Sequence, residues 1–298
     1  MKNSTGSTLS DLGLNTGKKT RLHRILFKSG IGNGKAMFLP IDQGIEHGPV
    51  DFFKNPESEN PEFQLAVAKE AGYSGIVFHI GIAEKYMNKF AGEVPLVLKL
   101  NGKTNIPPEN DPVSPQLATV EDAVRLGADA VGYTLYVGSP SQERDIVQFA
   151  GIRRDAEKYG MPIIVWAYPR GEAIEARGGK DSMYAIDYAA RTAAEVGADL
   201  VKVNYPDPAR ESKGVPKAYA DLKLTPVEAV NKVVRSAGRC LTLISGGAMM
   251  SDQDLLDKAE VCMKGGATGL IFGRNIWQRK YDEAVKISRE IAGILKKY

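Results

Sequence analysis

Apolar segments recur along the chain, and four of them begin just after a glycine that closes a helical pattern. The junctions read Ala71-Gly-Tyr-Ser-Gly-Ile-Val77, Leu126-Gly-Ala-Asp-Ala-Val131, Val196-Gly-Ala-Asp-Leu-Val201 and Gly265-Gly-Ala-Thr-Gly-Leu-Ile-Phe272. Glycine suits the left-handed residue that ends many helices. A near-continuous apolar run is typical of a parallel strand that is covered on both faces. The pattern therefore predicts repeated strand–helix units and not a β-sandwich.

The full set of apolar runs predicts eight strands, beginning near residues 36, 75, 96, 130, 162, 199, 241 and 269. Eight strands with helices between them indicate an α/β fold, a single-domain (β/α)₈ TIM barrel. We expect residues 1–35 to form an N-terminal extension or helix and residues 36–298 to form the catalytic barrel. An open doubly wound sheet is the alternative, but no GxGxxG motif follows the first strand. Helix signals agree, with a capping box at Thr225-Pro-Val-Glu228 and a last amphipathic helix over about Trp277 to Lys297.

Composition narrows the choice of partners. The 298 residues are 43% hydrophobic and 25% charged, which argues against disorder, and the net charge of +3 is too small to indicate nucleic acid or a membrane surface. Cys240 and Cys262 lack metal-site spacing and predict free thiols of a reducing, cytoplasmic compartment. No apolar run reaches transmembrane length. We expect the basic stretch Lys18–Arg24 to be an exposed terminal helix or arm.

Two lysines interrupt apolar strands. In Leu200-Val-Lys-Val-Asn204, alternation places Lys202 on the face that points into the barrel. Burial and nearby cations would lower its pKa and leave a neutral amine that can form a Schiff base, although a lysine paired with an interior carboxylate would show the same pattern. Lys99, in Leu96-Val-Leu-Lys-Leu-Asn101, has the same surroundings. It could be the nucleophile, a charge partner of Lys202 or a phosphate ligand, and alternation does not separate these possibilities.

Other candidate residues lie where strands one and five end. Tyr168 and Arg170 share parity with Trp166 in Trp166-Ala-Tyr-Pro-Arg170. A phenol at this edge can move a proton and an arginine suits a phosphate, whereas a core tyrosine beside a surface ion pair is the plainer interpretation. Asp42 follows strand one and could orient an amine or bind a substrate hydroxyl.

Farther into the loop that follows strand one lie Glu46 and His47. His47 and His79 could in principle share a metal ion, but no HxH or HExxH spacing supports such a site. We therefore expect neither a metal site nor another cofactor.

The last two strands end in glycine-rich segments, Leu243-Ile-Ser245-Gly-Gly247 and Ile271-Phe-Gly273-Arg274. Glycines let backbone N–H groups approach an anion, and Arg274 adds a charge-assisted donor. The loops after strands seven and eight are the usual phosphate site of TIM barrels, which predicts a phosphorylated ligand. Proline-rich loops at 54–61, 105–115 and 206–216 follow strands one, three and six and are expected at the same rim.

Taken in order, these motifs resemble the archaeal-type class I fructose-bisphosphate aldolases, a family that also has bacterial members. The resemblance runs from about Phe38 to the C-terminus. Gln43 departs from the histidine of many archaeal members and is similar to the bacterial ones. The motifs that carry the resemblance are Pro40-Ile-Asp-Gln-Gly-Ile-Glu-His-Gly-Pro49, Leu98-Lys-Leu-Asn101, Gly132-Tyr-Thr-Leu-Tyr136, Trp166-Ala-Tyr-Pro-Arg-Gly171, Lys202-Val, Ser245-Gly-Gly247 and Gly273-Arg-Asn275.

The resemblance implies a metal-independent enzyme that cleaves fructose 1,6-bisphosphate reversibly, assembled as a homo-oligomer such as the decamer of the family. By position it implies that Lys202 forms the Schiff base, Tyr168 transfers the proton and Asp42 contacts substrate. The implied substrate-binding residues are Trp166, Arg170, Ser245, Gly246, Gly247, Gly273 and Arg274, with Lys99 as a further candidate. The alternatives are a related Schiff-base aldolase or transaldolase-type enzyme acting on another phosphorylated sugar, and a non-catalytic phosphosugar-binding barrel.

Overall fold

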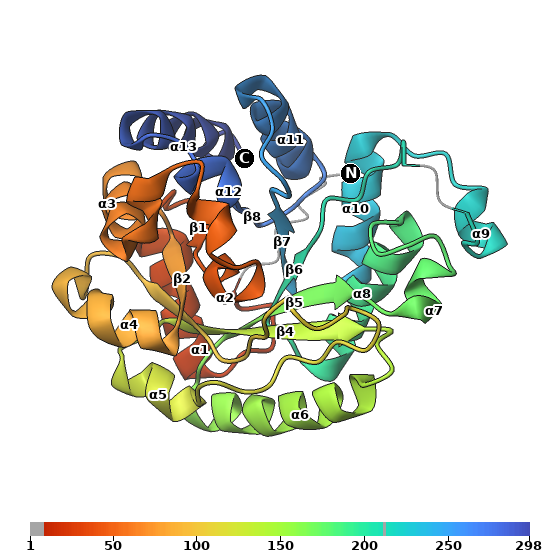
Figure 1. Cartoon of the computed structure of the whole chain (residues 1–298), viewed down its shortest axis with the longest axis horizontal. Helices are drawn as coiled ribbons and strands as arrows, with labels where there is room; N and C mark the ends of the chain where they lie inside the picture. The colour runs from red at the N-terminus through yellow and green to blue at the C-terminus, as the bar shows by residue number, and fades with distance from the viewer. Residues whose placement is uncertain (1–8, 211–212) are drawn as a thin grey trace.

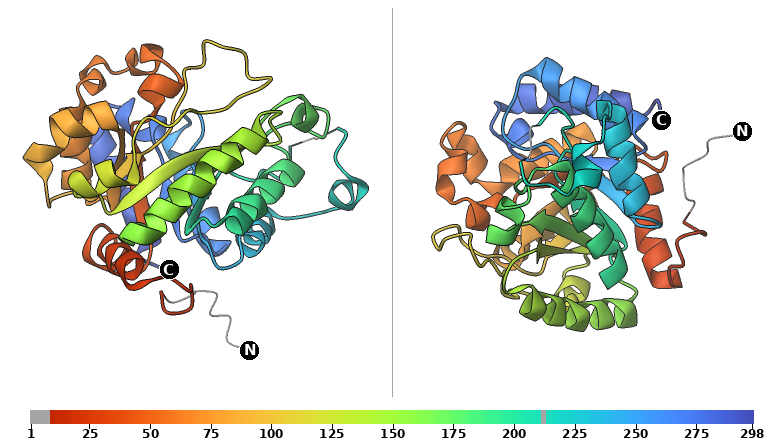
Figure 2. Two further views of the ribbon diagram at one scale, coloured as in Figure 1. Left: turned by 90° about the horizontal axis from the view of Figure 1, so that it is seen from below. Right: turned by 90° about the vertical axis from the view of Figure 1, so that its right-hand side faces the viewer.

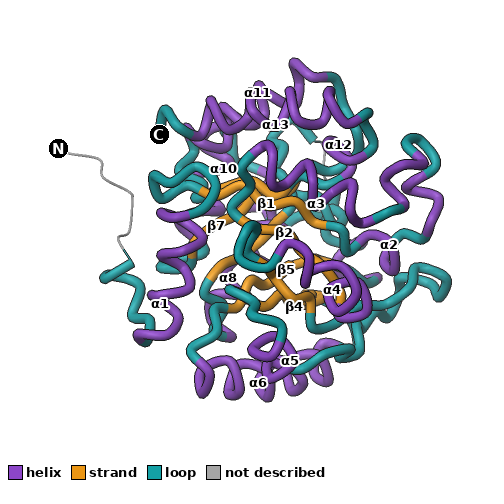
Figure 3. Tube along the Cα trace, turned by 90° about the vertical axis from the view of Figure 1, so that its left-hand side faces the viewer, coloured by secondary structure: helices purple, strands orange, loops and turns teal. Residues whose placement is uncertain are grey.

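Eight parallel strands close into a barrel in chain order, and β1 pairs with both β2 and β8. This computed structural model describes residues 9–210 and 213–298. Figure 3 shows the strands enclosed by helices, as the predicted TIM barrel requires. The strands are β1 (Ala36–Pro40), β2 (Gly75–His79), β3 (Leu96–Lys99), β4 (Ala130–Val137), β5 (Ile163–Pro169), β6 (Leu200–Val203), β7 (Leu241–Ser245) and β8 (Gly269–Ile271).

Helices surround the barrel in sequence order (Figure 1). The helices of the ring and of its connections are α3 (Pro61–Ala71), α4 (Ile80–Tyr86), α5 (Val120–Arg125), α6 (Gln142–Tyr159), α8 (Met183–Val196), α10 (Pro226–Ser236), α11 (Asp252–Lys264) and α13 (Tyr281–Leu295). Short helices at the strand ends are α2 (Gln43–Glu46), α7 (Glu172–Glu175), α9 (Lys217–Ala220) and α12 (Arg274–Trp277), with single turns at Pro49–Phe52, Pro56–Glu59 and Met87–Phe90. No helix of the described residues is long and apolar enough to cross a membrane.

Successive side chains along each strand point alternately outward and inward, and they form two separate apolar cores. Val201 and Val203 pack in the layer between the strands and the helices, whereas Leu200 belongs to the cluster inside the barrel. Lys202 has the parity of Leu200 and is buried. The side chain of Lys202 therefore points into the barrel, as predicted.

The N-terminal basic stretch forms a terminal helix, as expected, but the expectation that it is exposed was wrong. It forms α1 (Thr16–His23) and a π-helical turn (Arg24–Lys28) across the barrel end opposite the long loops (Figure 2). Leu22, Ile25 and Leu26 are buried and belong to the cluster inside the barrel. The ammonium of Lys18 is also buried, 3.0 Å from an Asp199 carboxylate oxygen and 2.8 Å from one of Glu157. Apolar residues at helical spacing, which the surrounding charges obscure in the sequence, hold the segment in place.

Capping boxes mark the start of two helices, whereas the start of the last helix differs from the prediction. Thr225 and Glu228 form the predicted capping box of α10, and Thr119 forms another with Asp122 at the start of α5. The last helix, expected from about Trp277, instead starts at Tyr281. Lys280 adopts an extended conformation and separates α13 from the short helix α12, which ends at Trp277.

The loops that follow β3 and β6 project beyond the strand ends, as predicted (Figure 2). The loop after β3 is tied at its base, where Asn101 pairs with Gln116 across a β-bridge and donates to the Ser114 carbonyl oxygen at 3.3 Å. Its residues 104–111 are all exposed. The segment 54–61 lies at the same end but lines no part of the cavity described below.

Candidate active site

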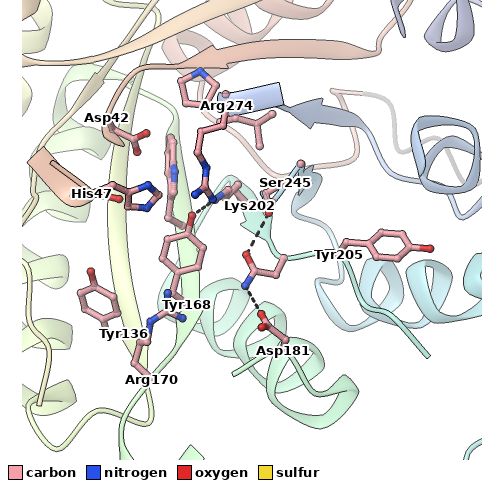
Figure 4. A pocket seen from close by; sticks show the side chains of 18 of the residues that line it. Asp42, His47, Tyr136, Tyr168, Arg170, Asp181, Lys202, Tyr205, Ser245 and Arg274 are labelled. Atoms are coloured by element: carbon pink, nitrogen blue, oxygen red, sulfur yellow. Dashed lines mark hydrogen bonds between the residues drawn. The ribbon is translucent and has the colours of Figure 1, made fainter. Parts of the chain in front are cut away.

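A cavity of about 400 Å³ opens at the carboxyl ends of the strands, where TIM barrels hold their active sites. Figure 4 shows side chains from β5, β6, β7 and the loops after β1 and β8 pointing into it. Charged and polar side chains make up most of the lining of this cavity. Of the predicted site residues, those that line the cavity are Asp42, Trp166, Tyr168, Arg170, Lys202, Ser245, Gly246, Gly247, Gly273 and Arg274.

Lys202 and Tyr168 meet at the centre of this cavity. The Lys202 Nζ contacts the Tyr168 hydroxyl and lies 4.2 Å from the centroid of the tyrosine ring. Trp166 pairs with Lys202 in the register of β5 and β6, so the adjacent strands bring the amine and the phenol together. An amine in contact with a group that can accept or return its proton is suited to nucleophilic addition to a carbonyl.

Lys99 is in a different situation, although its strand pattern is the same. Its side chain is fully buried, and its Nζ lies 3.2 Å from an Asp42 oxygen and 2.7 Å from a Glu46 oxygen. The same ammonium is 4.9 Å from the centroid of a Trp166 ring. Two carboxylates and an aromatic face therefore stabilise Lys99 as a cation and leave it little freedom to react.

The pKa values of Lys202 and Lys99 are therefore shifted in opposite directions. Burial, the largest effect, and the charges of Lys99 and Arg274 together lower the pKa of Lys202 to about 7, against the opposing effect of Asp42 and Glu46. Burial alone would lower the pKa of Lys99 too, but the Glu46 and Asp42 carboxylates outweigh it and raise that pKa. At neutral pH, a large fraction of Lys202 is therefore the free amine, while Lys99 remains charged.

Asp42 is buried at the end of β1, and burial alone would raise its pKa. The neighbouring cations, Lys99 foremost, hold the pKa of Asp42 below its usual range. Its carboxylate is thus ionised and engaged with Lys99, from where its charge also reaches Lys202. The side chain of Gln43, the next residue, lies outside the part that the structure describes.

The predicted phosphate loops line the side of the cavity formed by β7 and β8. Gly247 has a φ of +79°, a conformation that a side chain would strain. Asn275 joins the two loops, because its side chain accepts from the Met250 N–H at 2.9 Å and donates to the Ala248 carbonyl at 3.0 Å. Ser245 donates to the Asn204 side-chain oxygen at 3.2 Å. The loops are therefore held in place before any anion arrives.

Arg170 lies on the other side of Lys202 and Tyr168. Figure 4 shows Tyr168 between Arg170 and Arg274, with the Lys202 amine at the tyrosine hydroxyl. The Arg170 guanidinium carbon is 5.2 Å from the centroid of the Tyr168 ring, and one of its nitrogens donates to the Pro169 carbonyl at 2.8 Å. The cavity thus has a cationic group at each end and an amine between them.

No metal centre emerges from the histidines. His47 pairs with Asp51 through its Nδ1 at 2.7 Å, while both ring nitrogens of His79 are buried and its pKa is lowered to about 4, mainly by burial and then by the charge of Lys99. Within residues 9–210 and 213–298, no group of three or more His, Cys, Asp or Glu side chains is arranged to hold a metal ion.

Sequence reasoning missed several residues that line this cavity, and three of them have charged side chains that contact predicted site residues. Glu46, expected farther out in the loop, turns inward on α2 to Lys99. Lys258 of α11 donates to the Gly246 carbonyl at 3.0 Å, behind the phosphate loop. Glu109 of the loop after β3 reaches Arg170. Only Lys258 carried a usable signal, because it lies three residues after Leu255 and four before Cys262, on the buried face of α11.

Comparison with known proteins gives consistent matches. The model of the DeoC/LacD family aldolases matches residues 36–279. A class 1 fructose-bisphosphate aldolase of Thermoproteus tenax is 41% identical over 88% of this chain and 90% of its own. A protein of Methanocaldococcus jannaschii named fructose-bisphosphate aldolase/6-deoxy-5-ketofructose 1-phosphate synthase is 31% identical over 88% of this chain and 81% of its own.

Among solved structures, an archaeal fructose-1,6-bisphosphate aldolase superposes with a TM-score of 0.79 and 39% identity, over 92% of this chain and 99% of its own. In that structure, the catalytic lysine is covalently bound to the carbinolamine intermediate of the substrate.

Proposed function

This chain belongs to the DeoC/LacD family of aldolases, and from that premise we propose that it is a class I fructose-bisphosphate aldolase. The observation that carries the proposal is the Lys202 amine, with its pKa lowered to about 7, in contact with Tyr168 between two cationic groups. A ketose with a phosphate at each end matches this order of charges. The family match also argues against a non-catalytic phosphosugar-binding barrel.

In the proposed reaction, the free amine of Lys202 adds to the C2 ketone to form a carbinolamine, and loss of water gives an iminium ion. With its own proton passed to solvent, Tyr168 as the phenolate accepts the proton of the C4 hydroxyl, and the electrons of the C3–C4 bond move into the iminium to form an enamine. Glyceraldehyde 3-phosphate leaves. The Tyr168 phenol returns that proton to the enamine carbon and restores the iminium, and water then releases dihydroxyacetone phosphate and regenerates the amine.

The remaining residues bind and orient the substrate. Ser245, Gly246, Gly247, Gly273 and Arg274 would hold the C1 phosphate, and Arg170 the C6 phosphate. Trp166 would line the sugar site, and Asp42 would set the charge around the amine through Lys99. Lys99 acts in this proposal as a charge partner and not as a phosphate ligand. Binding energy from the phosphates orients the reacting carbons.

We expect the purified protein to cleave fructose 1,6-bisphosphate, and we expect excess EDTA to leave the rate unchanged. The iminium provides the electron sink that a metal ion provides in other aldolases. A coupled assay of glyceraldehyde 3-phosphate release measures both. Loss of activity on EDTA treatment that added Zn²⁺ restores would contradict the Schiff-base mechanism.

A second prediction concerns pH. The rate at which dihydroxyacetone phosphate forms its adduct is expected to rise between about pH 6 and pH 8, with a midpoint near 7, because the reactive amine forms as pH rises through the lowered pKa of Lys202. Glu46→Gln should move the midpoint to lower pH, since the Glu46 charge raises that pKa. Adduct trapped with cyanoborohydride over short times gives the rates. A midpoint near the ordinary lysine value would contradict the assignment.

An aldolase for another phosphorylated sugar is the second candidate, because the Methanocaldococcus relative carries a synthase name beside the aldolase name. A panel of one-phosphate and two-phosphate ketoses separates the two.

We further propose that residues 36–298 form one catalytic domain with residues 1–35 as its extension. A homo-oligomer and a cytoplasmic location also remain proposals, which light scattering and cell fractionation would test.

A further inference from the structure

We propose that Glu109 occupies the distal phosphate site of the empty enzyme and is displaced by a substrate that carries a second phosphate. This inference rests on the proposed function, because it assigns Arg170 to the phosphate far from the Schiff-base end. The role is one of substrate selection, and it concerns a residue of the loop after β3 that takes no part in the chemical steps.

The contacts of Glu109 resemble those of a bound phosphate oxygen. One carboxylate oxygen, Oε2, lies 3.3 Å from the Arg170 Nε and 3.7 Å from the Lys180 Nζ. An arginine and a lysine that converge on one anionic oxygen form the usual donor set for a phosphate monoester. Both Glu109 and Arg170 line the cavity that holds Lys202.

The position of Glu109 allows it to leave. Its side chain is 45% exposed and that of Lys180 is 42% exposed, whereas Arg170 is only 15% exposed and is fixed against Tyr168 and the Pro169 carbonyl. Exposed ion pairs of this kind contribute little free energy. Arg170 is therefore held at the end of β5, and the exposed Glu109 is free to move away from it.

The loop provides a hinge for this exchange. Its base is fixed by the Asn101–Gln116 bridge and by the Ser139 hydroxyl, which donates to the Pro112 carbonyl at 2.7 Å. Between these points, residues 104–111 are exposed. Movement of this short exposed stretch is enough to remove Glu109 without disturbing the strands.

Selection follows from charge. A substrate with a distal phosphate dianion replaces the carboxylate and gains Arg170 and Lys180, but it must first compete with Glu109. A substrate without that phosphate leaves Glu109 in place, so Arg170 is never an unpaired cation beside Tyr168. The carboxylate thus weakens bisphosphate binding and does not affect one-phosphate sugars.

Glu109→Gln tests the proposal, since the amide keeps the shape and removes the charge. We expect the KM for fructose 1,6-bisphosphate to fall about fivefold, the gain expected when a weak competing ion pair is removed. The KM for fructose 1-phosphate should change less than twofold. Glu93→Gln is the matched control, because Glu93 forms a similarly exposed ion pair with Lys69 at 2.8 Å, outside the cavity lining. It should change neither KM.

Equal effects on both sugars, or a higher KM for the bisphosphate in Glu109→Gln, would overturn the proposal. Arg170→Gln supplies a second check. In that background, Glu109→Gln should no longer lower the bisphosphate KM, because the two residues act as a pair. If the wild-type protein cleaves neither sugar, the proposed function fails. Calorimetric titration with the same two sugars then still compares wild type with Glu109→Gln. A gain in affinity confined to the bisphosphate supports the displacement, and its absence refutes it.

Discussion

Replacing Lys202 with methionine is expected to abolish both cleavage of fructose 1,6-bisphosphate and borohydride-trapped adduct with dihydroxyacetone phosphate. Methionine has nearly the length of lysine and suits a buried position, so the barrel should fold. Loss of the nucleophile should lower kcat by about four orders of magnitude or more. In the wild-type protein, peptide mapping by mass spectrometry should place the reduced adduct on Lys202 alone.

The same experiment separates the two lysines that strand alternation leaves equivalent. Lys99 is held as a cation by Asp42 and Glu46, so its peptide should carry no adduct. An adduct on Lys99, or trapping that persists in Lys202→Met, would show that the assignment is wrong. Circular dichroism of the variant shows whether lost activity reflects lost structure.

Replacing Tyr168 with phenylalanine is expected to lower kcat by about 10² to 10⁴, the range for loss of a positioned proton-transfer group. The ring that Arg170 and Lys202 contact remains, so substrate binding should change little. The distinguishing expectation is that adduct still forms on Lys202, because the amine itself is intact. Single-turnover mixing followed by borohydride quench measures the adduct and the released aldehyde separately.

A Tyr168→Phe variant that loses adduct and cleavage in equal proportion would place Tyr168 in formation of the Schiff base and not in cleavage of the C3–C4 bond. Trp166→Phe is a useful companion, since it alters the same strand without removing a proton-transfer group. Its kcat should fall far less than that of Tyr168→Phe.

The barrel could be predicted because eight apolar runs alternate with helical patterns along the chain, and four of these runs begin just after a glycine that ends a helix. The inward direction of Lys202 followed from parity with Leu200 and is seen in the structure. Which lysine stays charged could not be predicted. That depends on Glu46, whose side chain reaches Lys99 only because the chain turns into α2 directly after β1. A contact between a helix residue and a strand residue far apart in the sequence leaves no periodic pattern.

Glu109 and the N-terminal helix illustrate two further limits. Glu109 lies in a loop without a repeating pattern, so nothing in the sequence relates it to Arg170. In the stretch Lys18–Arg24, the basic residues dominated the interpretation, while Leu22 and the apolar residues after it determined the burial. The basic residues indicated that part of this segment faces solvent, but the apolar residues determine where the segment packs.

The N-terminal segment closes the end of the barrel opposite the cavity. Leu22, Ile25 and Leu26 join an apolar column that continues through Ile164 up to Trp166, beside the amine. Water released when the Schiff base forms must therefore leave, and water that hydrolyses it must enter, by the same opening as the sugar. The N-terminal residues at the other end of the barrel thus help to exclude water from the apolar cluster below Lys202, and so contribute to the reactivity of its amine.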